Sequence, residues 1–208
     1  MTLFELIFIL LFLGSVVCLL LCAFFGLVRR KAASKRLLVA LASVWGVYLV
    51  ILAVTDVFSS QKVFKVGEDQ CFDEMCFAVA DVQTMPAQAF DSAGATGSKL
   101  YIVKVRVTSH SRGRAQAEGG LRGRLYDEEK YIDVSDSAQK SYDAQHGESP
   151  KLSGMVAPGE SILSVLVFEA TPGITHPALT LDHGFTPGYF VIGESPFFHK
   201  PDIHQLSP

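Results

Sequence analysis

Residues 6–28 have the sequence LIFILLFLGSVVCLLLCAFFGLV, and residues 37–55 have the sequence LLVALASVWGVYLVILAVT. These stretches of 23 and 19 residues contain no charged side chain. A helix rises about 1.5 Å per residue, so about 20 residues cross the hydrocarbon core of a bilayer, which is roughly 30 Å thick. The sequence therefore predicts a transmembrane helical hairpin within residues 1–58, with spans over about residues 4–28 and 37–57.

The first apolar stretch differs from a cleaved signal peptide. Signal peptides combine a basic N-terminal region with an apolar stretch of roughly 7–15 residues and a small-residue cleavage site. Here Glu5 is the only charged side chain before a longer apolar stretch. Neither Cys18 nor Cys22 follows the small residues that a lipoprotein signal requires. We therefore expect both helices to remain in the mature protein.

Residues 29–36, RRKAASKR, connect the two spans and contain five positive charges without a negative one. Short basic loops remain in the cytoplasm. Binding of lipid phosphates by this loop would give the same orientation, because the anionic membrane surface is also cytoplasmic. Both termini are therefore predicted to lie outside, with residues 59–208 exported. The residues that determine this topology are Arg29, Arg30, Lys31, Lys35 and Arg36.

Small residues recur every four positions along the first span, and a shorter series occurs in the second. Such series allow membrane helices to approach closely. We interpret them as contact faces of the hairpin, which could extend to the helices of a partner, and we disfavour a metal or redox role for the two cysteines. The residues are Gly14, Cys18, Cys22 and Gly26 in the first span and Ala42 and Gly46 in the second.

The exported part contains thirteen Lys and Arg against nineteen Asp and Glu, a net charge of about −6, which argues against nucleic-acid binding. Four arginines form a local basic cluster within it. This cluster is either a solvated loop and strand face or a patch for an anionic ligand. Its members are Arg112, Arg114, Arg122 and Arg124.

Cys71 and Cys76 are five residues apart. In an oxidising exported compartment, this spacing predicts a small structural disulfide ring rather than a C-x-x-C redox site. The histidines show no metal-ligand spacing, and no nucleophile-elbow or metalloprotease motif frames the Ser, His and Asp residues. We therefore predict no catalytic, cofactor-binding or metal-binding residues.

Residues 100–108, LYIVKVRVT, alternate between apolar and polar side chains, which is typical of an antiparallel strand with one buried face. Residues 161–169 are almost continuously apolar and predict a central strand. It follows a type II turn at Pro158-Gly159. Weaker strands are predicted over residues 63–66, 76–82, 121–126, 131–134, 152–156, 179–181 and 189–192. Eight or nine short strands indicate a β-sandwich.

Two intervals, residues 84–98 and 135–150, are predicted to be loops, and the second could hold a short helix near residues 138–145. Loops at the ends of a sandwich commonly carry binding function. The aromatic, Pro-rich tail after Gly193 could pack on the sandwich or contact a partner.

Several short motifs carry a family resemblance. They are FKVGE (64–68), CFD (71–73), LYD (125–127), APGES (157–161) and VFE (167–169). Together they resemble a bacterial family of immunoglobulin-like domains of unknown function, found on lipoproteins and membrane-anchored envelope proteins. The resemblance implies an immunoglobulin-like β-sandwich on the outer face of the bacterial cytoplasmic membrane. It supplies no catalytic residues.

These observations favour a non-enzymatic, membrane-anchored module for extracytoplasmic binding or assembly. Its expected partners are the lipid bilayer and a protein of the membrane or envelope, and it needs no cofactor. The first alternative is an accessory subunit of a larger membrane transport complex. The second is an envelope enzyme.

Overall fold

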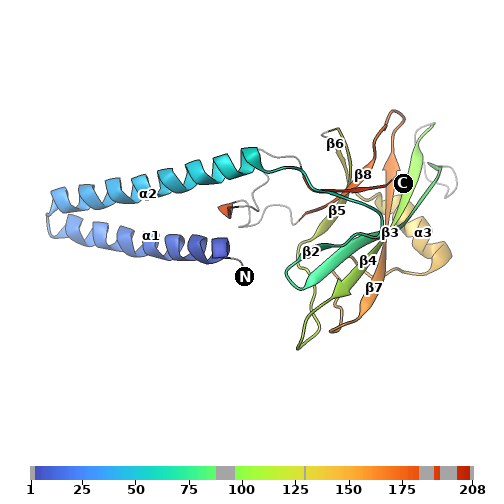
Figure 1. The fold of residues 1–208 in the computed structure, drawn as a ribbon, viewed down its shortest axis with the longest axis horizontal. Helices are drawn as coiled ribbons and strands as arrows, with labels where there is room; N and C mark the ends of the chain where they lie inside the picture. The colour runs from blue at the N-terminus through green and yellow to red at the C-terminus, as the bar shows by residue number, and fades with distance from the viewer. Residues whose placement is uncertain (1–2, 88–96, 129, 183–189, 193–200, 207–208) are drawn as a thin grey trace. The chain divides into compact units, whose positions relative to one another are not determined.

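The computed structural model describes residues 3–87, 97–128, 130–182, 190–192 and 201–206. The chain divides into two compact units (Figure 1). One contains residues 1–60 together with 185–200, and the other contains residues 61–184 together with 201–208.

The first unit is built on two antiparallel helices, α1 (Leu3–Leu27) and α2 (Lys31–Phe58) (Figure 1). The connection between them is shorter than predicted. Arg29, which adopts a left-handed backbone with φ of 59°, lies in the turn, and α2 begins at Lys31. The predicted loop 29–36 is therefore wrong over residues 31–36, because Lys, Arg and Ala are good helix formers and no Gly or Pro delays the start of α2.

The side chains between α1 and α2 are spaced three and four residues apart. This spacing is the heptad repeat by which two helices stay in contact along their length. The α1 members, buried or half-buried, are Phe8, Leu11, Ser15, Cys18, Cys22 and Phe25. The α2 members include Ser34, Leu37, Leu41, Trp45, Tyr48 and Leu52. We call these two series the hairpin seam.

The second unit is a sandwich of two β-sheets. The five-stranded sheet has the order β1 (Val63–Phe64), β9 (Ile203–Gln205), β8 (Ala178–Asp182), β5 (Arg122–Asp127) and β6 (Lys130–Ile132). The four-stranded sheet has the order β2 (Gln70–Phe72), β3 (Met75–Pro86), β4 (Lys99–Ser109) and β7 (Ser161–Ala170). Neighbouring strands are antiparallel except β1 and β9, which are parallel.

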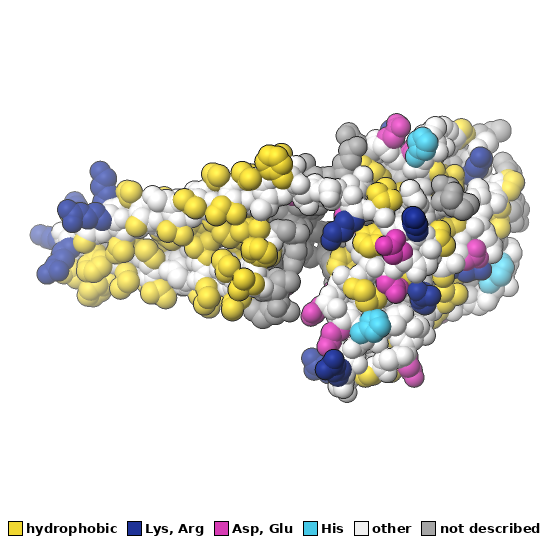
Figure 2. Space-filling view, in the orientation of Figure 1, with side chains coloured by type: hydrophobic (Ala, Val, Ile, Leu, Met, Phe, Trp, Pro, Cys, Tyr) yellow, Lys and Arg dark blue, Asp and Glu magenta, His cyan; other side chains and the backbone are white. Residues whose placement is uncertain are grey.

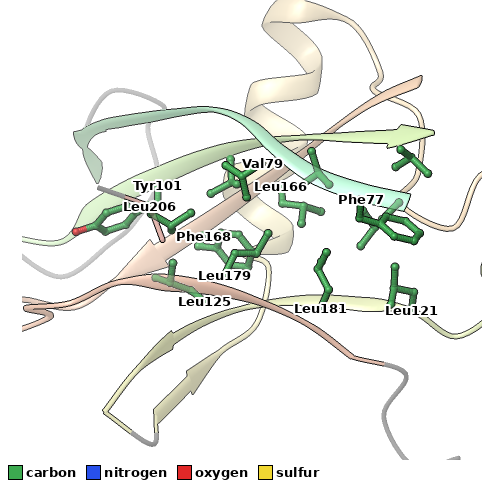
Figure 3. Packing of buried hydrophobic residues seen from close by; sticks show 14 of the residues in the cluster. Phe77, Val79, Tyr101, Leu121, Leu125, Leu166, Phe168, Leu179, Leu181 and Leu206 are labelled. Carbon is green, nitrogen blue, oxygen red and sulfur yellow. The ribbon is translucent and has the colours of Figure 1, made fainter. Parts of the chain in front are cut away.

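Apolar side chains from both sheets fill the space between them (Figure 3). The predicted alternation of β4 is confirmed, because Tyr101, Val103, Val105 and Val107 all face this core. The opposite sheet contributes other side chains, which include Leu121, Leu125, Leu179 and Leu181. The sequence pattern therefore identified the face of β4 that packs in the core between the sheets.

The outer side of the four-stranded sheet carries a helix, α3 (Asp136–His146), which the sequence had suggested within the second loop. The side chain of Ser135 accepts a hydrogen bond from the Ala138 backbone N–H and caps the helix start. Ala138 and Tyr142 of α3 pack in a second apolar cluster with Ile102 and Val167. The helix thus gives the sheet a second buried face.

This packing explains why the prediction of a central position for residues 161–169 is wrong. β7 is an edge strand, but the core covers one of its faces and α3 covers part of the other. Part of its outer edge is also covered, since the Ser135 N–H donates to the Val167 carbonyl and the Val167 N–H donates to Gln139 Oε1 (2.9 and 3.0 Å). A strand that is buried on both faces needs a continuous apolar sequence wherever it lies in the sheet.

Other local predictions have mixed outcomes. The turn before β7 is confirmed, because Gly159 has φ of 74° and the Glu160 N–H donates to the Ala157 carbonyl (3.0 Å). Residues 152–156 form only an isolated bridge, between Val156 and Gln116, and residues 190–192 form no strand. The short strands β2 and β9 were not predicted, because three residues are too few for a period of two to be recognised.

Candidate functional site

The outer side of the four-stranded sheet is covered by α3 over one half and is uncovered over the other. The uncovered half presents a row of polar side chains, which we call the open face. Registers between the strands place its members on the same side of the sheet. They are Asp81, Lys104, Arg106, Thr108, Ser161 and Leu163, with Asp69 beside them.

A β-bulge determines which way Asp81 points. The register between β3 and β4 shifts between Val79 and Asp81, with Ala80 as the extra residue. Strict alternation from Phe77 and Val79 would turn Asp81 into the core, whereas the bulge turns it outward, opposite Lys104, and turns Val82 inward. The sequence signal for this bulge is the change in apolar spacing from two residues to three between positions 79 and 82.

The open face is a row of cross-strand polar pairs. Lys104 Nζ lies 2.9 Å from Asp81 Oδ2, which also accepts from Gln83 Nε2 (3.1 Å). Arg106 donates to Asp69 (3.2 Å), and the hydroxyls of Thr108 and Ser161 lie 2.8 Å apart. The hydrogen bonds from Lys104 and Gln83 lower the pKa of Asp81, and the bond to Asp81 raises the pKa of Lys104.

Exposed ion pairs of this kind are individually weak, since both charges remain well hydrated. Their side chains can therefore exchange partners when another polar surface approaches. Chemically, the open face offers two cations, two carboxylates and two hydroxyls for contact. Among the residues that the structure describes, no group of three or more His, Cys, Asp or Glu is placed to hold a metal ion.

The predicted disulfide is confirmed and borders the open face. Cys71 in β2 lies directly opposite Cys76 in β3, with their Cα atoms 4.0 Å apart, and the two sulfurs are bonded. The strands are joined by a tight turn in which Asp73 adopts a left-handed backbone with φ of 54°. Because Cys76 pairs with Thr108, the disulfide fixes the end of the sheet beside the polar row.

The predicted arginine cluster is divided in the structure. Arg124 is paired with Asp182 through Nη2 (2.6 Å) and lies over the ring of Tyr131, 4.2 Å from its centroid. Arg112 and Arg114 are exposed in the connection between β4 and β5. The contacts of Arg124 favour a solvated strand face over a patch for an anionic ligand.

The two predicted binding loops are largely regular structure. Residues 84–86 belong to β3, residues 136–146 form α3, and residues 88–96 lie outside the described residues. The first interval contacts the second, because Met85 and Ala87 pack in the same apolar cluster as α3. Both intervals therefore help to cover the sheet next to the open face.

In the hairpin, the predicted small-residue stripe only partly coincides with the seam. Cys22 is buried there, and Ser34 Oγ donates to its carbonyl (3.2 Å). Cys18 lies 3.9 Å, sulfur to oxygen, from the Leu37 carbonyl. At Gly14, Gly26 and Gly46, by contrast, an added Cβ would meet nothing within 4 Å, and Ala42 is exposed.

The helical repeat explains this division. A step of four residues advances about 400° around the helix, so each step drifts about 40° from the last. A stripe centred on Cys18 and Cys22 therefore has Gly14 and Gly26 about 60° to either side. The interpretation of Gly14, Gly26, Ala42 and Gly46 as contacts within the hairpin is wrong for this reason, and a contact with a partner stays a prediction.

His204 is completely buried in the sandwich. Its Nε2 lies 3.0 Å from Gln70 Oε1 and its ring stacks on Phe64 (4.9 Å between centroids), so it links β9 and β1 to β2 of the other sheet. Nδ1 has no hydrogen-bond partner among the described residues. Burial lowers its pKa from 6.5 to about 4, against the opposing charges of Glu68, Asp202 and Asp69.

Comparisons with known proteins show no match to any family model or any curated protein. Four solved bacterial structures are similar to part of the chain. A conserved hypothetical protein from Bacillus anthracis is 15% identical over 59% of this chain and 92% of its own, with a TM-score of 0.44. The yjhA protein from Bacillus subtilis is 15% identical over 69% of this chain and 99% of its own, with a TM-score of 0.41.

A third is an uncharacterized β-sandwich protein from Clostridium difficile, 9% identical over 72% of this chain and 97% of its own, with a TM-score of 0.32. No activity follows from likeness at this level.

Proposed function

We propose that this chain is a non-enzymatic binding or assembly module, anchored in the bacterial cytoplasmic membrane by its helical hairpin, with its β-sandwich on the outer side. The observation that carries the proposal is the apolar surface of the hairpin. Mean hydropathy reaches 3.1 in the most apolar part of α1 and 2.6 in that of α2, yet only 11% of each of these parts is buried (Figure 2). Apolar surface of this extent is stable in hydrocarbon and unfavourable in water.

The charges at the closed end of the hairpin support the orientation. The five basic residues around the turn gather at one end, away from the apolar length of both helices (Figure 2). Short basic segments stay in the cytoplasm, so both ends of the chain would lie outside. The Cys71–Cys76 disulfide agrees with this orientation, because disulfides persist in oxidising compartments.

We further propose that the sandwich is immunoglobulin-like. The support is strand order: β3-β4-β7 corresponds to strands A-B-E of that fold and β5-β8-β9 to strands C-F-G, with β6 as an added strand beside C. The chain departs from antibody domains in two respects. α3 stands between β6 and β7, where strand D would occur, and the disulfide joins β2 to β3 within one sheet.

The open face is the surface that we propose for binding a protein partner. Its paired side chains lie on rigid strands, and the disulfide fixes one end of it. Opposite charges in alternating positions give specificity for a complementary polar surface. Leu163, which is exposed beside this row, offers an apolar contact.

A second candidate function is an accessory subunit of a larger membrane transport complex. The observation that favours it is the open space at Gly14, Gly26 and Gly46, since small residues on the outside of a membrane hairpin allow a partner's helix to approach closely. Replacing Gly14 and Gly26 by Leu would then abolish co-purification with that partner. Val17→Leu, at an exposed position on the same helix, is the matched control.

Single-cysteine labelling tests the membrane topology. In a Cys18→Ser, Cys22→Ser background the other two cysteines remain paired, so an impermeant maleimide reports only an introduced cysteine. Ser161→Cys on the open face should react in intact spheroplasts. Ala32→Cys, which is exposed beside the basic turn and removes no charge, should react only after lysis. The reverse pattern, or reaction of both before lysis, would overturn the proposed orientation.

A further inference from the structure

The first unit contains a segment that is distant from the hairpin in sequence. Phe190, Val191 and Ile192 follow the end of α2 by about 130 residues, yet Val191 and Ile192 are buried. Ile192 joins one apolar cluster with Tyr48 and Leu52. The ring of Phe190 is nearly parallel to that of Phe8, with 6.5 Å between the centroids.

A hydrogen bond fixes this segment to α2. The hydroxyl of Tyr48 donates to the backbone carbonyl of Phe190, across 142 residues of sequence. Tyr48 lies ten residues before the end of α2 and seven before Thr55, the last residue of the uncharged stretch. At about 1.5 Å per residue, this places the bond about 10 Å inside the apolar length of the helix.

Backbone outside a helix is unfavourable in hydrocarbon unless its polar groups are satisfied by the protein. The Phe190 carbonyl meets this requirement through Tyr48, and the three side chains of the segment are apolar. Trp45 packs edge-on against Tyr48, with 5.7 Å between ring centroids, and its indole N–H donates to Ser15 Oγ (2.9 Å). The Tyr48 hydroxyl and the Trp45 indole N–H beside the segment are therefore paired, and Phe190 keeps 38% of its surface exposed.

We propose that residues 190–192 are a membrane-inserted segment, which lies in the outer half of the bilayer against the hairpin and contacts lipid acyl chains through Phe190. This inference rests on the proposed span of the hairpin. It gives the chain a second point of membrane contact, about 130 residues of sequence after the end of α2. The Tyr48 hydroxyl holds the segment at that depth.

The test uses the full-length chain in vesicles of phosphatidylcholine and phosphatidylglycerol, with Cys18→Ser and Cys22→Ser. A nitroxide is attached at Phe190→Cys, which leaves the backbone carbonyl in place. Its collisions with oxygen, which concentrates in lipid, are compared with its collisions with a water-soluble nickel complex. The reference sites are Leu13→Cys on the exposed side of α1 and Ser161→Cys in the sandwich.

We expect the label at position 190 to be relaxed mainly by oxygen, as at Leu13. Tyr48→Phe should shift it toward relaxation by nickel. Ser43→Ala, which removes a hydroxyl bonded only within α2 (2.9 Å to the Val39 carbonyl), should not. Nickel-dominated relaxation at position 190, with oxygen-dominated relaxation at Leu13, would overturn the insertion alone. Nickel-dominated relaxation at both sites would overturn the proposed membrane span.

A second measurement avoids the label. Hydrogen exchange of the Val191 and Ile192 amides in the unlabelled chain should be slow in vesicles and faster in Tyr48→Phe. Exchange at the rate of an unstructured peptide in the parent chain would contradict the proposal.

Discussion

In the hairpin, Leu10, Leu20 and Val50 each expose 60–66% of their surface, whereas in the sandwich Phe77, Phe168 and Leu179 are completely buried. Both units contain many large apolar side chains, but the hairpin exposes most of them and the sandwich buries most of them. The hairpin is held by a narrow seam that includes the Ser34–Cys22 and Trp45–Ser15 hydrogen bonds. The sandwich is held by a core that both sheets fill.

The membrane span that we propose for the hairpin accounts for this difference, because the two units would then lie in different solvents. The sandwich buries its apolar side chains away from water by its own folding. The hairpin leaves them outside, and in the proposed span the hydrocarbon of the bilayer would cover them. Equivalent substitutions in the two units should therefore have unequal effects on the stability of the sandwich.

The largest effect is expected from truncating a buried ring. Phe168→Ala should lower the free energy of unfolding of the sandwich by about 3–5 kcal/mol, because it removes apolar contacts and leaves a cavity. Leu20→Ala, at an exposed position on α1, should leave it unchanged. Hydrogen exchange of the β4 amides in the full-length protein measures both. An equal loss in the two variants would contradict the contrast.

A pH-dependent loss is expected from His204. Because its pKa is about 4 in the folded state and 6.5 in the unfolded state, the unfolded chain binds the proton first. The contribution is complete above pH 6.5 and is lost as the pH falls toward 4, by about 3 kcal/mol.

Urea titrations between pH 7 and pH 4 would show a shallower loss of stability in His204→Gln than in the parent. His146→Gln, at an exposed position on α3, is the matched control. Identical profiles for His204→Gln and the parent would show that His204 does not carry this effect.

Breaking the disulfide is expected to cost less. Cys71→Ser should destabilise the sandwich by about 2 kcal/mol, since the bond closes a ring of only a few residues. Cys18→Ser, in the hairpin seam, should leave the melting temperature of the sandwich unchanged. Thermal unfolding with and without a reductant measures the difference. Reductant should lower the melting temperature of the parent and not that of Cys71→Ser.

The smallest effect compares two glycines. A Cβ at Gly123 would lie 2.5 Å from Leu166 Cδ1, so Gly123→Ala should destabilise the sandwich by about 1–2 kcal/mol through overpacking. Gly14→Ala in α1 meets open space and should cost nothing. Gly119→Ala is the control within the sandwich, because no atom lies within 4 Å of its Cβ. Urea unfolding of the three variants tests this order.

Sequence patterns predicted local structure correctly where an element is buried on one face only, or where a turn requires particular residues. The alternation of residues 100–108 identified the buried face of β4, and the Pro158-Gly159 pair identified the turn before β7. The same patterns misled where a second element changed the surroundings. α3 makes an edge strand resemble a central one, because it buries the other face of β7.

The open face was not predicted as a site. Its central pair, Asp81 and Lys104, depends on the bulge at Ala80. The two residues come from different strands, and the sequence did not reveal how those strands pair. The sequence did predict the Cys71–Cys76 disulfide that borders it, because the two cysteines are close along the chain.

By itself, the sequence determined that this protein has two long apolar helices with a basic turn, a β-rich remainder and a disulfide ring. All of these depend on residues that are near one another in the chain. Only the tertiary structure decided the outward turn of Asp81, the link from His204 to Gln70 and the bond from Tyr48 to the Phe190 carbonyl. The last two join residues 134 and 142 positions apart, and local periodicity contains no information about such pairs.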